Sequence, residues 1–572
     1  MKQTTRLLAL GMTAAMTAGL LAGCGGNTGS KDPAPAASGS VSAEGLALSV
    51  SVASEPETMD PALNRTVDGG IMAHHLFENL YKWVDSSDGA GDGEGGPTAV
   101  LGLGMAKEEP EITENADGTY TWTFTLRDDA KWSDGESVTA NDFVYAWQRL
   151  VSPDLAAPYN YIIDMVVNAV DVREGNKDAS ELGVSAPDEH TFVVDLTYNC
   201  PYFKEICAFP CTMPLREDVV SANSNWAQDP ASYLCNGPMK LESWTHNAEI
   251  VMVPNDQYYD AGSVTLSKLT FKLMDDTRAM LTAFNNGELD FINNAPVDEM
   301  AALLANGTLI AGEYLGTYYV DFNNAKAPFD NEKVREAFNL AIDRNYITEQ
   351  VTQLGEVPAS GWVPDGVYDA AGADGDDFRT TGGDYWSVDP DQYEANCEKA
   401  RQLLAEAGYP DGAGFPAVIY LYNTDDKHSA IAEALQSMWK DVLNVDVTLN
   451  NQDWNVFLST RTDGNYDMAR DGWICDYNDP VSFMDMFMTG NGNNNAQYSN
   501  SEYDAMMTKV LNDSDAEDRM ELMHKCEDLL LSQDSAIAPL YYYTQPYMMA
   551  EGLSGMYYTP LGFFLFTNVT KG

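Results

Sequence analysis

The sequence predicts an α/β fold. Strand and helix signals alternate along the chain, most clearly where strands at 417–422 and 445–449 flank a helix near 428–441. Two further helices carry N-cap signals, at Thr139 and Asp389. Strand–helix–strand order of this kind is typical of layered α/β proteins. The chain has 572 residues, so at about 150 residues per domain it has room for three to four domains.

In chain order, residues 1–23 are predicted to be a targeting segment. Two basic residues precede an apolar stretch from Leu7 to Leu21 that is short for a membrane span. The segment ends in Leu-Ala-Gly before Cys24, which resembles the lipobox of bacterial lipoproteins and implies cleavage before Cys24 and lipidation of its thiol. The alternative is an ordinary secretory signal cut nearby. Residues 24–45 are small, polar and Pro-containing, which is typical of a flexible tether.

The body of the chain begins with alternating patterns. From Tyr120 to Leu126, polar residues alternate with large apolar ones, which predicts a half-buried strand. Thr139 with Asp142 three residues later resembles a capping box and begins a helix that ends before Pro153. Thr191 to Thr197 repeats the strand pattern.

Helix signals dominate the later part of the body. Apolar spacing predicts a helix at 334–341, and another begins at Asp389 and stops at Gly408. Two acid- and Gly-rich stretches, at 85–97 and 372–384, are predicted to be exposed connections. Adventitious calcium is the alternative there, although neither stretch fits the calcium-loop pattern.

The composition narrows the class of partner. Asp and Glu number 87 against 32 Lys and Arg, a formal net charge of −55. This argues against nucleic acid as a partner, because phosphate binding needs a basic patch, and against electrostatic docking onto an anionic membrane. The main expected role of so acidic a surface is solubility. The alternative role is electrostatic steering of cationic ligands.

The motifs of catalysis are missing. The sequence has no GxSxG elbow, no HExxH, no phosphate loop and no GxGxxG that opens a helix after a strand. The tandem His74-His75 is expected to be a solvated or core-edge pair, with a metal site as the alternative. We therefore expect no catalytic residue, metal or cofactor. Seven Cys besides Cys24 match no zinc signature and are predicted to be buried thiols, with a local disulfide or a metal as alternatives.

Residues 470–480 place an Arg and several carboxylates around apolar residues. Such charges need partners if they are buried, and a zwitterionic ligand would supply them. With this cluster and the stretches at 131–149, 235–240, 328–335 and 451–480, the chain resembles the oligopeptide-binding proteins of bacterial ABC importers. These belong to the peptide/nickel class of extracellular solute-binding proteins, family 5.

The resemblance implies a two-lobe, periplasmic-binding-protein-like (Venus flytrap) fold with an extra domain on the first lobe. Domain I would be residues 46–77, 217–315 and 545–572, domain II 78–216 and domain III 316–544. The crossovers near 315 and 545 would form the hinge. It also implies a lipid-anchored monomer on the outer face of the cytoplasmic membrane. This receptor would capture oligopeptides and deliver them to the membrane permease subunits of an ABC importer, without catalysis.

The resemblance also assigns residues to the peptide. Asp476 falls where the family binds the peptide α-ammonium. Arg470 falls where the carboxylate of a shorter peptide is met, and His428 where that of a longer one is met. The remaining matches are the cleft-lining positions and one backbone contact: Tyr159, Trp454, Tyr319, Trp473, Arg461 and, for the backbone contact, Val67.

The sequence departs from that family at several positions. Gly316 and Ile474 stand where enteric members have a disulfide. Thr352 replaces a Lys that meets the carboxylate of the longest peptides, and Arg65 replaces a Glu that faces the side-chain region. Binding of the longest peptides and a preference for basic side chains at that pocket therefore do not carry over by resemblance. The alternatives are the same fold with a nickel chelate, haem, opine or oligosaccharide as ligand, and an exported hydrolase. Retention of both Asp476 and Arg470 argues against the other ligands.

Overall fold

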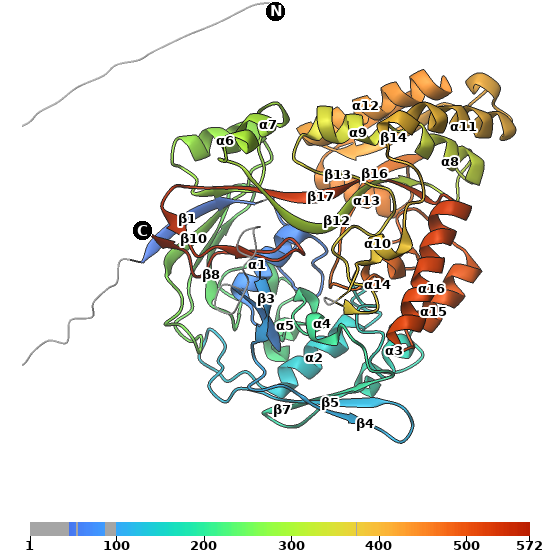
Figure 1. The fold of residues 1–572 in the computed structure, drawn as a ribbon. Coiled ribbons are helices and arrows are strands. Elements are labelled where there is room, and N and C mark those ends of the chain that lie inside the picture. The colour runs from blue at the N-terminus through green and yellow to red at the C-terminus, as the bar shows by residue number, and fades with distance from the viewer. Residues whose placement is uncertain (1–44, 53–54, 86–98, 373–374) are drawn as a thin grey trace, which may run out of the picture. The chain divides into compact units, whose positions relative to one another are not determined.

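The computed structural model describes residues 45–52, 55–85, 99–372 and 375–572 (Figure 1). Its largest feature is a mixed 11-stranded sheet in the order β15-β14-β16-β12-β17-β11-β1-β10-β9-β8, with β13 paired to β17. One half holds β1 (Leu46–Ser51), β8 (Met239–Thr245), β9 (Glu249–Pro254), β10 (Leu266–Lys272) and β11 (Phe291–Ile292). The other holds β13 (Val357–Pro358), β14 (Val418–Asn423), β15 (Val447–Gln452) and β16 (Met468–Ile474).

Two long antiparallel strands join the halves. β12 (Ile310–Phe322) and β17 (Ile537–Met549) each have 13 residues. β17 pairs with β11 at one end, and β12 pairs with β16 from Gly316 onward. The register between β12 and β17 is interrupted between Glu313 and Thr317. The two halves of the sheet are therefore connected through an irregular stretch of paired backbone.

Helices cover the sheet in two groups (Figure 1). α6 (Thr277–Asn285) and α7 (Val297–Ala305) lie over the first half, and α8 (Glu332–Leu340), α11 (Tyr393–Glu406) and α12 (Asp426–Leu443) over the second. α12 buries Ile431, Leu435 and Trp439 at helical spacing. The Trp439 Nε1–H donates to the carbonyl of Phe338 at 3.0 Å, which ties α12 to the end of α8.

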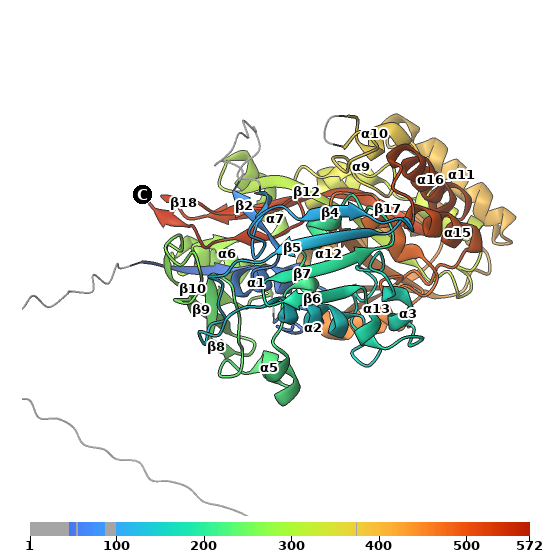
Figure 2. The ribbon, with the colours of Figure 1, turned by 90° about the horizontal axis from the view of Figure 1, so that it is seen from below.

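A separate four-stranded antiparallel sheet lies beside this assembly (Figure 2). Its order is β4 (Glu111–Glu114), β5 (Tyr120–Thr125), β7 (Thr191–Leu196) and β6 (Val184–Asp188). α2 (Ala140–Leu150) packs on it through Phe143 and Trp147, whose rings lie 5.5 and 5.3 Å from Phe192. The predicted capping box is confirmed, because Asp142 accepts the Thr139 N–H at 2.8 Å.

The predicted strands and helices of the body are found within a few residues of their expected bounds. The exposed connection expected at 372–384 is wrong in part. α10 (Phe378–Gly382) begins there, Phe378 stacks on His524 with 4.0 Å between ring centroids, and Arg379 pairs with Glu527 at 2.7 Å. The acid- and Gly-rich composition predicted exposure, but tertiary packing buries Phe378 and Arg379.

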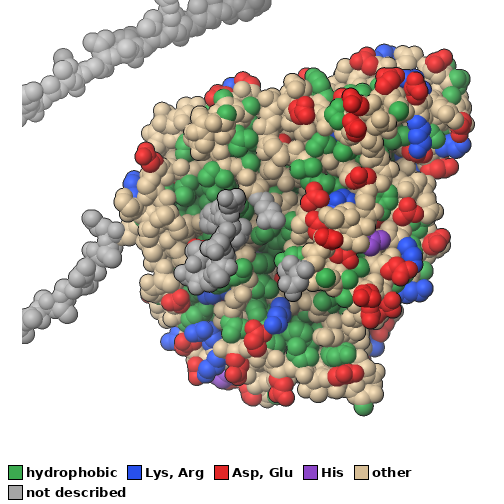
Figure 3. Space-filling view, viewed as in Figure 1, with side chains coloured by type: hydrophobic (Ala, Val, Ile, Leu, Met, Phe, Trp, Pro, Cys, Tyr) green, Lys and Arg blue, Asp and Glu red, His purple; other side chains and the backbone are tan. Residues whose placement is uncertain are grey.

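The buried-thiol prediction is confirmed. Cys475 is buried, and six further cysteines are buried without a bridge: Cys200, Cys207, Cys211, Cys235, Cys397 and Cys526. Asp and Glu side chains spread over the face shown in Figure 3, with Lys and Arg between them. No helix in the described part of the chain is both long and apolar enough to span a bilayer. Cys24, the targeting segment, the tether to residue 44 and the stretch 86–97 lie outside the described residues.

Candidate functional site

A cavity of about 390 Å³ lies where segments far apart in the sequence meet. Its walls come from the start of α1 (Val67–Leu76), α13 (Trp454–Thr462), β16 with the loop after it, and residues 561–564. Seven of the nine residues predicted for the ligand site line it: Val67, Tyr159, Trp454, Arg461, Arg470, Trp473 and Asp476. The other two, His428 and Tyr319, neighbour lining residues.

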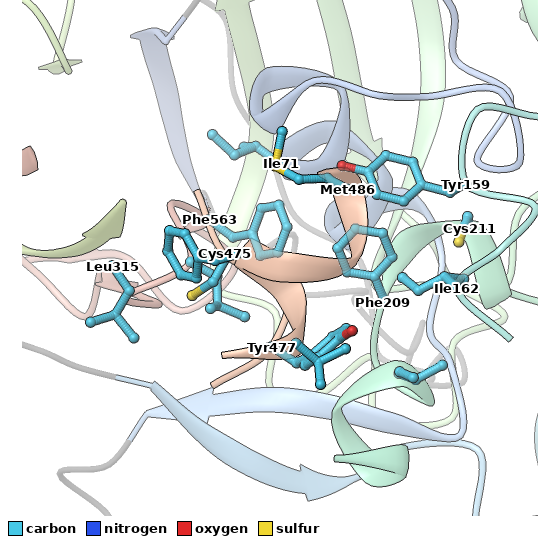
Figure 4. Close-up of a cluster of buried hydrophobic side chains, with 14 of the residues drawn as sticks. Ile71, Tyr159, Ile162, Phe209, Cys211, Leu315, Cys475, Tyr477, Met486 and Phe563 are labelled. Atoms are coloured by element: carbon cyan, nitrogen blue, oxygen red, sulfur yellow. The ribbon is translucent and has the colours of Figure 1, made fainter. Parts of the chain in front are cut away.

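The apolar part of the wall is built by side chains from separate elements (Figure 4). Ile71 comes from α1, Tyr159 and Phe209 from the segments around the small sheet, and Phe563 from the C-terminal segment. The Tyr159 and Phe209 rings lie 5.2 Å apart. A Cβ on Gly70 would come within 2.6 Å of Phe563, so glycine is what lets this ring pack on α1. One side of the cavity is therefore apolar and firmly packed.

Asp476 is a buried carboxylate at the end of this wall. It is 7% exposed and follows β16, and its N–H donates to Ser482 Oγ at 2.7 Å. The Tyr159 hydroxyl donates to Asp476 Oδ1 at 3.2 Å. None of the ion pairs of the described residues includes Asp476. Burial raises the pKa of Asp476 to about 8, because no positive charge offsets the loss of water.

Arg470 is a buried guanidinium on β16, 9% exposed. Its Nε donates to Asn423 Oδ1 at 2.8 Å, and its Nη2 lies 2.8 Å from His428 Nε2. Its Cζ is 5.7 Å from the centre of the Trp454 ring. Arg470 is in no ion pair among the described residues, so its charge has neutral partners only.

His428 contacts Arg470 and is not among the residues that line the cavity. It lies in the first turn of α12, which Asp425 caps by accepting the Lys427 and His428 N–H groups. Burial and the charge of Arg470 hold the pKa of His428 well below its ordinary value. The ring is therefore neutral, and its Nε2 accepts from Arg470 while Nδ1 faces the Tyr318 hydroxyl at 3.4 Å.

Arg461, in contrast, is neutralised inside the protein. Its Nη1 pairs with Asp471 Oδ1, and Asn495 Nδ2 donates to the other oxygen of Asp471 at 2.9 Å. Asp321 lies fully buried beside them, and burial with the charge of Asp471 raises its pKa well above the ordinary value. Tyr319 pairs with Asp471 across β12 and β16 and packs edge-on against Trp362, 4.6 Å between centroids.

Sequence reasoning placed Arg65 at the side-chain region of the ligand by resemblance and missed Asp68. Arg65 lines the cavity but holds Glu57 through two hydrogen bonds of 2.9 and 3.0 Å. Asp68, the second residue of α1, also lines the cavity and forms no ion pair among the described residues. The only signal for Asp68 in the sequence was its place just after Thr66, at the start of an apolar run. This pattern predicts a helix N-terminus, but it does not predict that the Asp68 side chain faces a cavity.

Contacts beside the cavity join the small-sheet region to the loop after β16. The Tyr202 and Tyr477 rings stack with centroids 4.2 Å apart and planes at 2°. Glu205, on α4 (Phe203–Ile206), accepts the Asn478 N–H at 2.8 Å. These contacts hold the segment around α4 against the loop that carries Asp476, and burial raises the pKa of Glu205 to about 7.

Comparison with known proteins places this geometry in a family. The model of the bacterial extracellular solute-binding proteins, family 5 (Middle), matches residues 102–495. The periplasmic oligopeptide-binding protein OppA of Salmonella typhimurium is 36% identical over 509 residues, which cover 88% of each chain. The structure of Haemophilus influenzae OppA in complex with RPPGFSPFR matches with a TM-score of 0.82 and 32% identity, covering 92% of this chain and 99% of that one.

Two structures of one relative differ in how well they match. The murein tripeptide-binding protein MppA of Escherichia coli gives a TM-score of 0.81 at 31% identity, covering 91% of this chain and 96% of that one. A structure of MppA in its unliganded open form gives only 0.60 at 31% identity, covering 92% and 96%. These neighbours confirm the predicted α/β two-lobe fold. The chain belongs to the bacterial extracellular solute-binding proteins, family 5.

Proposed function

We propose that this protein is an extracytoplasmic receptor that captures oligopeptides and delivers them to the permease of an ABC importer. The observation that carries the proposal is a buried carboxylate, Asp476, and a buried guanidinium, Arg470, that line one cavity without ionic partners in the described chain. A peptide with free ends supplies the complementary pair. Its α-ammonium would meet Asp476 and its carboxylate Arg470, through charge-assisted hydrogen bonds in a low-dielectric site.

The other lining residues fit a ligand recognised by its main chain. Val67 would make a backbone contact, and Trp454 and Trp473 would flank the chain. Arg461 is already paired with Asp471. We therefore expect it to form part of the cavity wall and not to bind a charged group of the ligand. His428, which contacts Arg470, would meet the carboxylate of a longer peptide, and Tyr319 would support the wall through Asp471. Affinity would come from groups that every peptide shares, with side chains in hydrated pockets.

Capture would require closure of the two lobes. Domain I (46–77, 217–315, 545–572) with domain II (78–216) would form one lobe, and domain III (316–544) the other. The interrupted register between Glu313 and Thr317 supports a hinge in β12 and β17. A ligand shifts such an equilibrium only by binding the closed state more tightly than the open one. We further propose lipidation at Cys24, which would hold a monomeric receptor on the outer face of the cytoplasmic membrane near its permease.

Calorimetry of the full chain with a blocked-end series tests the proposal. The series is Ala-Ala-Ala with free ends, the same peptide N-acetylated, and the same peptide C-amidated. We expect the free-ended peptide to bind and each blocked end to weaken binding at least about tenfold, because each leaves one buried charge without its partner. Equal affinity for all three peptides, or no binding by peptides of three to five residues, would contradict the proposal.

A further inference from the structure

Five side-chain amides line the cavity: Asn64, Asn293, Asn493, Asn495 and Gln545. The four asparagines each donate from Nδ2 to another group of the protein, at 2.8 to 3.0 Å. Gln545 differs from them. It is 3% exposed, its Oε1 is buried without a hydrogen-bond partner, and no hydrogen bond of the described residues uses its Nε2. Its main chain pairs with Gly312 on β12, so the sheet uses the backbone of this residue and leaves its side-chain amide unused.

The face of β17 that carries Gln545 packs against the cavity wall. Side chains two residues apart lie on the same face of a strand, so Tyr543 and Tyr547 share the face of Gln545. Their rings pack on two rings that line the cavity. The centroids of Tyr543 and Tyr314 lie 5.7 Å apart, and those of Tyr547 and Phe564 lie 5.8 Å apart. The amide of Gln545 therefore lies between aromatic neighbours, on one of the two strands that join the halves of the sheet.

A buried amide oxygen without a donor is costly, because it has lost its hydrogen bonds to water and gained none in exchange. Native proteins leave few such groups without a partner. The asparagines of the same wall show that the protein satisfies its other lining amides internally. A ligand that enters the cavity can supply the donor that Gln545 lacks, and a main-chain N–H is a donor that every peptide of two or more residues carries.

We propose that Gln545 binds one residue of the captured peptide through its main chain, so that the receptor discriminates an amide linkage from an ester. The Gln545 Oε1 accepts that residue's N–H, and its Nε2 donates to the carbonyl oxygen of the same residue. In an extended chain both groups of one residue point to the same side, which is how paired strand residues exchange two hydrogen bonds. A side-chain amide carries a matching acceptor and donor side by side. The inference rests on the proposed function, because it needs a peptide in the cavity.

The test replaces one amide of Ala-Ala-Ala by an ester, which removes a single N–H and keeps the chain length and both charged ends. Lactate in place of the second or the third alanine gives the two esters, and calorimetry at pH 7 measures the affinities. The wild type should bind one of the esters about tenfold or more weakly than Ala-Ala-Ala. Gln545→Met keeps the length of the side chain without its amide. It should bind Ala-Ala-Ala about fivefold or more weakly than the wild type, and that ester should cost it about twofold at most.

Two controls separate ligand binding from a structural role. The exposed Gln228→Met is the matched variant and should bind all three ligands as the wild type does. Without ligand, Gln545→Met should melt no lower than the wild type, because the change removes a buried acceptor that has no donor.

The other outcomes overturn the inference. If Gln545→Met binds Ala-Ala-Ala as tightly as the wild type does, the amide is not a ligand contact. If both esters cost the variant as much as they cost the wild type, Gln545 only shapes the wall. In both cases the proposed function stands, because Ala-Ala-Ala still binds. If Ala-Ala-Ala does not bind the wild type, the proposed function fails and this inference fails with it.

Discussion

Replacing Asp476 by Asn is the sharpest test of the proposed site for the peptide α-ammonium. An N-acetylated peptide has no ammonium, so the Asp476 carboxylate would stay buried without a cation when the cavity closes on it. Burial without a cation raises the pKa of Asp476 to about 8. At pH 7 the group must then take up a proton. Protonating a carboxylate of ordinary pKa near 3.9 at pH 7 costs about 3 pK units, or about 4 kcal/mol at 1.36 kcal/mol per unit. The wild type should therefore bind the acetylated peptide about 1000-fold more weakly than Asp476→Asn does.

The sign of the pH dependence follows from the same pKa. A carboxyl pKa raised on closure opposes closure above pH 4, and the penalty grows tenfold in affinity per pH unit up to about pH 8. Affinity of the wild type for the acetylated peptide should rise about 100-fold from pH 7 to pH 5. Asp476→Asn should lack this slope. With the free-amine peptide it should lose about 2–5 kcal/mol, because the ammonium then has no counter-charge.

Tryptophan fluorescence or calorimetry between pH 5 and 8 measures these affinities, and the exposed Asp154→Asn is the control. The reasoning is refuted if acetylated peptides bind the wild type equally at pH 5 and pH 7, or if Asp476→Asn keeps the wild-type slope with the fold intact by circular dichroism.

Three further predictions concern Glu205, the proposed partners of the peptide carboxylate and the proposed lipidation of Cys24. Burial raises the pKa of Glu205 to about 7, and its contact with Asn478 joins segments of the two proposed lobes. Glu205→Gln should therefore raise peptide affinity relative to wild type at pH 8 but not at pH 5, because Gln keeps an acceptor for the Asn478 N–H without a charge that closure would bury; a ratio independent of pH would exclude this. Arg470→Ala should weaken shorter peptides more than longer ones and His428→Ala the reverse, measured by calorimetry on a length series; equal losses would remove the assignment. Cys24→Ala should release the protein from membranes in a fractionation assay, and a membrane-bound variant beside unmodified wild-type protein would contradict lipidation.

The sequence predicted the elements of the fold where local rules act alone. The capping box at Thr139 and the α12 helix between two strands follow from residue spacing and were found as expected. The burial of Phe378 and Arg379 was not predictable, because it depends on Glu527 and His524, about 150 residues away. Local composition predicts the exposure of a segment only on average, and contacts with residues distant in the sequence can bury individual side chains within it.

The candidate site, too, could be predicted only in part from the sequence. Which residues line the cavity was predictable by resemblance for seven positions, five of which lie in the stretch 451–480 that matches without a gap. Which charges are already neutralised was not predictable. Arg461 and Arg470 are the same residue type nine positions apart, and only the structure shows that Asp471 pairs with the first and not the second.

The geometry of β16 explains this difference. Arg470 and Asp471 are adjacent in the sequence and opposite in charge, so in a loop or helix end they could approach one another. On a strand, successive side chains point to opposite faces. Asp471 is therefore directed to Arg461 and Asn495, while Arg470 is directed to Asn423 and His428, both neutral. Strand alternation thus separates an Arg-Asp dipeptide into one internally satisfied carboxylate and one guanidinium whose charge is left for a ligand.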